Sequence, residues 1–356
     1  MKFRKYLLNA GLVLAFSVIG LVLVEVGARL LFGAPVQTRG TLFFSDNTFA
    51  NGDASAVRFS PDSSIRAISQ FGDYTEFDVR FKTNNKGLVD SRAYPLAAVT
   101  PPVRNIAIVG DSFTAGYHGG IPWVPDLQQR LSGANIYNLG VTGTGFEQFD
   151  QLQGELADDL NISETLIVAI SSDVVRKSWR PVKQQNRLYF CSRDTATADC
   201  LKRKSSVFLL RGDESENDIR AIAQQNAQDT RKPGLKRYLS RHTYVGRLFH
   251  ARTWKKRTKK LDTVAVADFS IAALQRMHNR LGPTLTLLQI PERREVETNG
   301  YSADLKSVAG SIGIRFVNGL TECGLTYGDY YDLDSHPNAS GYAKIQTCVA
   351  RVLTHG

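Results

Sequence analysis

The sequence lacks the signals of several large classes of protein. No cysteine or histidine cluster has metal-ligand spacing, so no structural zinc or other metal site is expected. No zinc-finger, RRM-type or helix-turn-helix signature accompanies the net charge of +10, so nucleic acid is not an expected partner. There is neither a G-x-G-x-x-G motif nor a Walker lysine, and no cofactor is predicted. No internal repeat is visible.

What is present is the composition of a globular protein. Hydrophobic residues make up 42% of the 356 residues and charged residues 22%, so most of the chain should fold. The length is enough for one large α/β domain or two small ones. The positive net charge suits an anionic membrane surface or an anionic polymer.

The N-terminus predicts a membrane anchor. Basic residues at 2, 4 and 5 precede a charge-free stretch from Tyr6 to Val24, and further apolar residues continue to Phe32. A helix needs about twenty apolar residues to cross a bilayer, and a positive flank places the N-terminus in the cytoplasm. A cleaved signal peptide is the competing interpretation, but no A-x-A-like site follows. We therefore expect residues 6–32 to span the inner (cytoplasmic) membrane once, with the remainder periplasmic or extracellular.

The four cysteines fit an oxidising compartment. Cys191 and Cys200 enclose a short polar segment that turns easily, so a local disulfide is expected between them. Cys323 and Cys348 would then form a second one. Counting alone leaves other pairings open.

The pattern along the chain divides it into an N-terminal tail (1–5), the anchor (6–32), an extension (33–102) and a main domain (103–356). In the main domain, predicted strands alternate with predicted helices, which is typical of a parallel sheet covered on both faces. The predicted strands are 106–109, 134–138, 166–170, 285–290 and 314–317, and the predicted helices are 123–131, 146–160, 265–281 and 339–353.

A long segment, 176–262, interrupts this alternation and is predicted to form an inserted cap or lid. It contains the basic run RTWKKRTKK, Arg252 to Lys260. Such a run is usually a solvated helix face. Beside a membrane it would also suit contact with anionic headgroups.

Chemistry is suggested first where the strand Ile106–Val109 stops at Gly110-Asp111-Ser112. A serine at the carboxyl end of a strand, entering a helix, can be presented as a nucleophile with its backbone N–H free. The alternative is that Asp111 or Ser112 only caps that helix. A second segment, NLGVTGTG, leads from a strand through a glycine-rich turn whose N–H groups can face a developing negative charge.

Of the six histidines, His336 has the context of a general base. Asp332 and Asp334 precede it, while Pro337 stiffens the chain and Asn338 can cap the following helix. A histidine with a fixed orientation is what general-base catalysis requires. The other histidines are expected to lie at the surface or to serve packing.

Taken together, these segments resemble the conserved blocks of SGNH/GDSL-type serine hydrolases. VGDSFTAG is similar to the block with the nucleophile, which maps to Ser112. NLGVTGTG is similar to the block with the oxyanion glycine, Gly143, and DLDSHPNASGY to the block with the base, His336. The resemblance covers Asn105 to the C-terminus without the insertion, and FKTNNKGLVDS is similar to a segment of membrane-anchored members. It implies a three-layer α/β/α sandwich and an acyl-serine intermediate.

The chain departs from the family pattern at two places. Where the third block usually has an asparagine that donates to the oxyanion, AISSDVVR has Ser172. The family's acid usually stands three residues before the histidine, where this chain has Leu333. Asp334 is favoured as the acid over the alternative, Asp332, because a separation of two keeps both side chains on one side of an extended segment. The same D-x-H spacing occurs in SGNH-like polysaccharide acetyltransferases.

The resemblance implies a membrane-anchored esterase or deacetylase that acts on an ester of a cell-surface glycan or lipid. In its mechanism Ser112 attacks the carbonyl, His336 takes the proton, and the N–H groups of Ser112 and Gly143, with Ser172, hold the oxyanion. Two alternatives stay open. One is a polysaccharide O-acetyltransferase supplied by an integral-membrane acyl-transfer partner, and the other is a non-catalytic binding subunit of a membrane complex.

Overall fold

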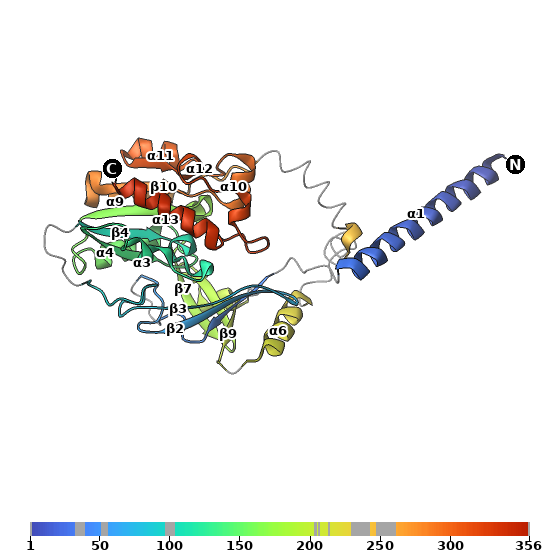
Figure 1. Cartoon of the computed structure of the whole chain (residues 1–356), viewed down its shortest axis with the longest axis horizontal. Coiled ribbons are helices and arrows are strands. Elements are labelled where there is room, and N and C mark those ends of the chain that lie inside the picture. The colour runs from blue at the N-terminus through green and yellow to red at the C-terminus, as the bar shows by residue number, and fades with distance from the viewer. Residues whose placement is uncertain are drawn as a thin grey trace.

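The structure, a computed structural model, describes residues 2–32, 40–50, 56–96, 104–202, 205, 207–212, 214–228, 243–246 and 261–354. The basic run 252–260 lies outside the described residues, as do His242, His250 and His355. The described chain forms one long N-terminal helix and a body built on two sheets (Figure 1).

The main sheet has five strands in the order β11-β10-β6-β4-β5, and all neighbours pair in parallel. Four of its strands are buried along nearly their whole length, as expected for strands covered on both faces, whereas the edge strand β11 is partly exposed. The predicted parallel sheet is therefore confirmed. The strands are β4 (Arg104–Gly110), β5 (Ala134–Gly140), β6 (Glu164–Ala169), β10 (Leu285–Gln289) and β11 (Arg315–Asn318).

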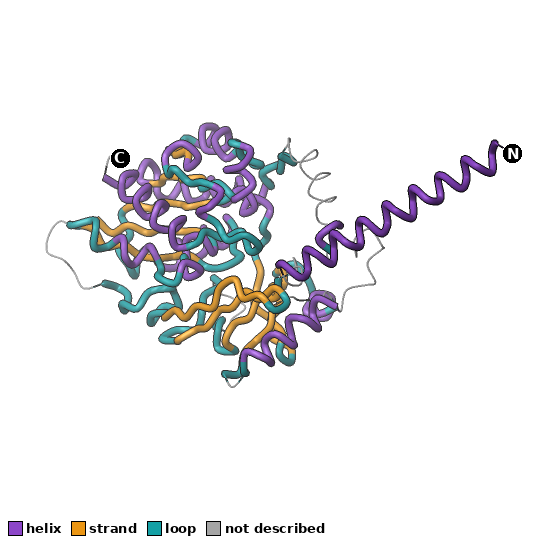
Figure 2. Tube along the Cα trace, turned by 45° about the vertical axis from the view of Figure 1, so that its right-hand side comes forward, coloured by secondary structure: helices purple, strands orange, loops and turns teal. Residues whose placement is uncertain are grey.

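Helices cover both faces of this sheet because successive residues of a strand point to opposite sides. In β4, Ile106 and Ile108 join the cluster beneath α3 and α13, whereas Ala107 and Val109 join the cluster beneath α4 and α9. The result is the expected three-layer α/β/α sandwich (Figure 2). The covering helices are α3 (Trp123–Leu127) and α13 (Ala339–Thr354) on one face, and α4 (Phe146–Leu156), α9 (Asp268–Leu281) and α11 (Leu305–Ile312) on the other.

Two helices are shorter than predicted. The helix predicted over 123–131 ends at Leu127, and the one predicted over 146–160 ends at Leu156. After α3 the Gln128 side chain accepts a hydrogen bond from the N–H of Ile136 at 2.8 Å, so the chain turns back toward β5. Helix ends are set by such tertiary contacts as much as by local pattern.

A second sheet joins two segments that are far apart in the sequence. Its order is β3-β2-β1-β9-β8-β7, and β1 pairs in parallel with β9. The predicted extension and the predicted cap therefore share one sheet, which no local pattern reveals. The extension supplies β1 (Thr41–Ser45), β2 (Ser64–Phe71) and β3 (Tyr74–Lys82), and the insertion supplies β7 (Trp179–Gln184), β8 (Arg187–Ser192) and β9 (Val207–Leu210).

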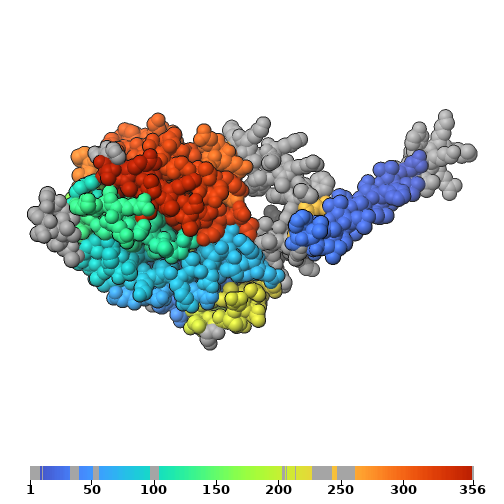
Figure 3. All heavy atoms as spheres, in the orientation of Figure 1, coloured from blue at the N-terminus to red at the C-terminus, as the bar shows by residue number. Residues whose placement is uncertain are grey.

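The second sheet packs against the main domain on one side and carries a helix on the other. Phe81 of β3 stacks on Tyr117 beside the main sheet with ring centroids 4.4 Å apart. On the opposite side, α6 (Glu216–Gln228) packs its Ile219 into a small cluster with Phe43 and Phe208. The light-blue extension lies directly below the red C-terminal segment in the space-filling view (Figure 3).

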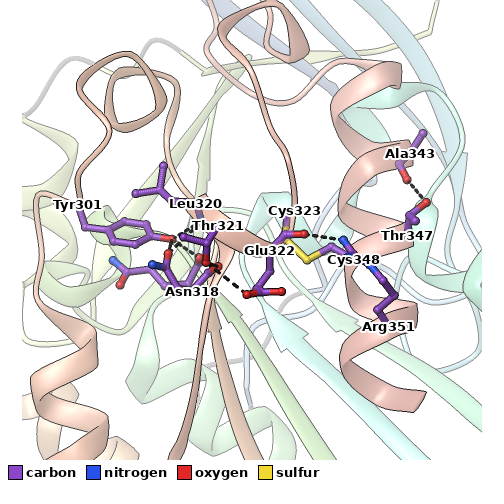
Figure 4. The surroundings of a disulfide bond; sticks show 11 residues. Tyr301, Asn318, Leu320, Thr321, Glu322, Cys323, Ala343, Thr347, Cys348 and Arg351 are labelled. Carbon is purple, nitrogen blue, oxygen red and sulfur yellow. Dashed lines mark hydrogen bonds between the residues drawn. A yellow bond between two sulfur atoms is a disulfide. The ribbon is translucent and has the colours of Figure 1, made fainter. Parts of the chain in front are cut away.

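Both expected disulfides are present in the structure. One joins Cys191 of β8 to Cys200 of α5 (Thr197–Leu201). The other joins Cys323, just after α12 (Gly319–Glu322), to Cys348 of α13 (Figure 4). The second bond closes a loop that includes residue 336.

The N-terminal helix α1 (Lys2–Phe32) projects away from the body (Figure 1). Its segment Gly11–Phe32 is long and apolar enough to cross a membrane, and an N-terminal signal sequence would have the same length and composition. With the two disulfides, this helix fits a protein of an oxidising compartment.

Candidate active site

Ser112 lies at the tight turn between β4 and the short helix α2 (Ser112–Ala115). Asp111 caps this helix, since its Oδ1 accepts the N–H of Phe113 at 2.8 Å. A side chain at Gly110 would come within 2.4 Å of the Val168 carbonyl oxygen, so the close packing of the turn requires glycine. The two interpretations of the motif are thus compatible: the aspartate caps the helix and the serine is its first residue.

The structure brings together Ser112, His336 and Asp334. The Oγ of Ser112 lies 2.9 Å from Nε2 of His336, and Nδ1 of His336 forms a short hydrogen bond with Oδ1 of Asp334. Between the two, Ser335 has a φ of 69°. Asp332 is instead directed toward Arg293, whose Nη2 lies 2.6 Å from its Oδ1, and its side chain is 85% exposed.

Backbone contacts hold the histidine loop in place. The N–H of Tyr331 donates to the carbonyl oxygen of His336 at 2.9 Å, and the N–H of Asn338 donates to that of Asp329 at 2.9 Å. The loop thus folds back on itself between η4 (Tyr327–Asp329) and α13. This gives His336 the fixed orientation that a general base needs.

The charges around His336 favour its protonated form. Burial alone would lower the pKa of His336, but the Asp334 carboxylate outweighs it and raises that pKa above 6.5. Burial opposes ionisation of Asp334, yet the histidine lowers the pKa of Asp334 well below its usual value. An imidazolium at His336 is therefore stabilised by Asp334.

Gly143 stands in the turn after β5, with a φ of 73°, a conformation that favours glycine. Its carbonyl oxygen accepts the indole N–H of Trp179 at 2.8 Å. Within the described chain, neither the N–H of Gly143 nor that of Ser112 donates to another group. Both remain free to bind a negatively charged oxygen.

Ser172 lies in η2 (Ser171–Val175) after β6, at the expected place. Its hydroxyl oxygen accepts a hydrogen bond from Nη2 of Arg176 at 2.9 Å. Burial raises the pKa of the neighbouring Glu292 carboxyl, and the Ser172 hydroxyl partly offsets that rise. A hydroxyl has only one proton to donate. Ser172 therefore has fewer donors for an oxyanion than the asparagine amide that the resemblance leads one to expect there.

Arg176, which was not among the predicted site residues, links the loops that follow β4, β5 and β6. Its Nη1 lies 2.6 Å from both Asp111 and Asp173, two fully buried carboxylates, and 3.2 Å from the Thr144 carbonyl oxygen. Burial and the neighbouring Asp111 raise the pKa of Asp173 well above its ordinary value. The one signal in the sequence is that an aspartate follows each of two buried strands, at 111 and 173, because a buried carboxylate needs a counter-charge.

His118 was also missed as a neighbour of the site. It is 1% exposed, and its ring stacks on that of His336 with centroids 3.8 Å apart and an interplanar angle of 10°. Burial lowers the pKa of His118 well below 6.5, as does the neighbouring His336, so it stays neutral. With Asp334 these rings form a cluster of three groups that can ligate metal. Stacked rings direct their in-plane lone pairs side by side, however, and Asp334 is bound to His336, so the cluster is poorly arranged for an ion.

The loops that follow β4, β5 and β6 thus carry Ser112, Gly143 and Ser172 at the carboxyl edge of the parallel sheet, where open α/β sheets bind ligands. The loop before the last helix supplies His336 and Asp334. This is the arrangement that the resemblance to SGNH/GDSL-type hydrolases implies.

No protein-family model matches the chain, and no curated protein matches it in sequence. Solved structures similar to this chain include a lipase/acylhydrolase from Enterococcus faecalis (13% identity, 71% of this chain and 96% of that chain covered, TM-score 0.36). Another is a G-D-S-L family lipolytic protein from Veillonella parvula (14% identity, 71% of this chain and 99% of that chain covered, TM-score 0.32). A third is the psychrotrophic esterase EstA from Pseudoalteromonas sp. (13% identity, 71% of this chain and 97% of that chain covered, TM-score 0.34). At these identities and TM-scores, no substrate and no residue role passes from those proteins to this chain.

Proposed function

We propose that this chain is a serine hydrolase that cleaves esters through an acyl-serine intermediate. The observation that carries the proposal is the hydrogen-bonded series Ser112–His336–Asp334, with 2.9 Å between the hydroxyl oxygen and Nε2. A nucleophile, a base and a group that orients the base are the parts that nucleophilic catalysis requires. Two free N–H groups beside the nucleophile complete the set.

In the first half of the reaction, Oγ of Ser112 attacks the ester carbonyl carbon while Nε2 of His336 takes the hydroxyl proton. Asp334 keeps the remaining ring proton on Nδ1 and stabilises the imidazolium. The carbonyl oxygen becomes an oxyanion held by the N–H groups of Ser112 and Gly143. When the tetrahedral intermediate collapses, the alcohol leaves with the proton from His336, and the acyl group stays on the serine.

In the second half, a water molecule or a sugar hydroxyl attacks the acyl-serine and His336 takes its proton. The proton returns to Oγ of Ser112 as the acid or the new ester departs. The acceptor alone thus decides between hydrolysis and transfer. Ser172 can assist as a third donor when its hydroxyl proton turns toward the oxyanion, and one such donor is worth about 3–4 kcal/mol of transition-state stabilisation.

The proposed substrate is an ester of a cell-surface glycan or lipid, reached from an inner-membrane anchor with the domain in the periplasm or outside the cell. The apolar helix α1 and the two disulfides support this placement. The net charge of +10 suits an anionic surface or polymer.

Transfer is a second candidate function, favoured by one specific observation. The acid that reaches His336 is Asp334, two residues before it, which is the D-x-H spacing of SGNH-like polysaccharide acetyltransferases. In that case an integral-membrane partner would supply the acyl group to Ser112, and a glycan hydroxyl would accept it. An assembled triad gives no support to the remaining alternative, a non-catalytic binding subunit.

The test uses the full chain in detergent micelles with p-nitrophenyl acetate, with and without a glycan acceptor. Release of p-nitrophenol that Ser112→Ala abolishes, together with free acetate, supports hydrolysis. Acetylated glycan in place of acetate supports transfer. If the wild-type protein neither turns over the ester nor reacts with a fluorophosphonate probe, the catalytic proposal is wrong.

A further inference from the structure

The loop that carries the catalytic acid is held by a residue of the N-terminal extension. Both carboxylate oxygens of Glu76, in β3, accept backbone N–H groups of that loop. One binds the N–H of Leu333 at 2.7 Å and the other the N–H of Asp334 at 2.6 Å. Two bonds to consecutive amides fix the orientation of the peptide between them, and with it the direction of the Asp334 side chain.

The neighbouring strand holds the carboxylate of the acid itself. Ser69 of β2 is 2% exposed and donates its hydroxyl to Oδ2 of Asp334 at 3.0 Å. Because Oδ1 of Asp334 faces His336, each oxygen of this carboxylate has its own partner. The carboxylate therefore cannot rotate without losing one of the two bonds.

The hairpin of β2 and β3 has a β-bulge at this point. The β2–β3 ladder pairs Ser69 with Phe77 and Gln70 with Thr75, so Glu76 is the extra residue of a β-bulge. Bulges occur next to active sites, where they re-aim a side chain. The bulge here coincides with the two residues that contact the acid loop.

The same sheet reaches the other half of the site. From β7, Trp179 donates its indole N–H to the carbonyl oxygen of Gly143. The second sheet thus contacts both the acid–base loop and the oxyanion loop. It does so through side chains of the extension and of the insertion, the two segments that the main-domain motifs do not include.

We infer that Glu76 and Ser69 are positioning residues that orient Asp334 against His336, and that the second sheet is part of the catalytic machinery. The inference rests on the proposed function, because it assigns a role within that reaction. It adds that the SGNH-type domain is incomplete without the segment that follows the membrane anchor.

The experiment compares Glu76→Gln and Ser69→Ala in the full chain, each also combined with Asp334→Asn. Glutamine keeps the shape of Glu76 but has one acceptor oxygen, so one loop N–H loses its partner. The matched control is Asp78→Asn on the same hairpin, whose side chain pairs at the surface with Arg66, Oδ1 lying 2.8 Å from Nε, and contacts no part of the acid loop among the described residues. Circular dichroism and thermal unfolding establish that each variant is folded.

With p-nitrophenyl acetate we expect Glu76→Gln to lower kcat by about tenfold or more and Ser69→Ala by several-fold, with little change in KM. In the Asp334→Asn background the same two substitutions should change kcat by less than about twofold, since coupled residues are not additive. The inference is wrong if the losses of kcat in the single variants multiply fully in the double variants, or if Asp78→Asn loses as much kcat as Glu76→Gln.

A second readout does not depend on turnover. The proton on Nδ1 of His336 should give a far-downfield proton NMR resonance, which Glu76→Gln and Ser69→Ala should shift and Asp78→Asn should leave unchanged. Should the wild-type protein prove inactive, the proposed function fails, and this resonance still decides the inference. A resonance that is identical in all four proteins contradicts it.

Discussion

Replacing Arg176 by methionine should destabilise the protein in a pH-dependent way. The guanidinium contacts Asp111 and Asp173, each at 2.6 Å, and both carboxylates are fully buried. Methionine keeps the length of the side chain but leaves two buried carboxylates without their counter-charge. Breaking a buried ion pair by removing one partner costs about 3–5 kcal/mol. Near neutral pH we expect a loss of stability of that size, which lowers the melting temperature by about 5–8 °C for a folded body of this length.

The sign of the pH dependence follows from the pKa of Asp173, which is raised even with the arginine present. The stability that such a carboxyl contributes is fully present below its unfolded pKa of 3.8, and it is lost as pH rises from there through the raised folded-state pKa. Removing the cation raises that folded-state pKa further. The difference between wild type and Arg176→Met should therefore be smallest near pH 4 and grow toward pH 8.

Thermal unfolding of both proteins across this pH range, followed by circular dichroism, measures the effect. Arg176→Lys serves as the matched control, because it keeps the charge but cannot bind both carboxylates and Ser172 at once. It should be intermediate in stability. Equal stability of wild type and Arg176→Met at pH 8, or the same difference at both ends of the range, would refute the reasoning.

Further predictions concern the site itself. Asp334→Asn should cut kcat for p-nitrophenyl acetate by orders of magnitude, because the tautomer of His336 is no longer fixed. Asp332→Asn should leave kcat nearly unchanged. If Asp332→Asn loses more activity than Asp334→Asn, then Asp332 is the acid. Ser172→Asn should raise kcat by up to about a hundredfold if the amide supplies the third oxyanion donor, and a lower kcat would show that the hydroxyl is needed as it is. Replacing Cys323 and Cys348 by alanine should lower the free energy of unfolding, measured with denaturant, by about 3 kcal/mol. It should also reduce kcat for the ester. An unchanged kcat would show that the loop holding His336 does not depend on this disulfide.

The parts of the fold that could be predicted from sequence are those with a local signal. The run Ile106–Val109 is apolar and ends at Gly-Asp-Ser, so both a buried strand and the place of Ser112 follow from adjacent residues. The spacing between Asp334 and His336 is equally local, and the structure brings those two side chains together.

The contacts that the sequence did not reveal all join distant segments. Glu76 meets the loop of Asp334, and Ser69 meets its carboxylate, across more than half of the chain. His118 stacks on His336 only once both lie at the same edge of the sheet. No periodicity records such pairings, because they depend on how the second sheet packs against the first.

The central claim is that Ser112 is the nucleophile, and a fluorophosphonate probe can identify that residue. We would treat the folded full chain with the probe, digest it and locate the adduct by mass spectrometry. We expect one adduct, on the peptide that contains Ser112, and none after treatment of Ser112→Ala. An adduct on another residue, or no adduct on a folded wild-type protein, would contradict it.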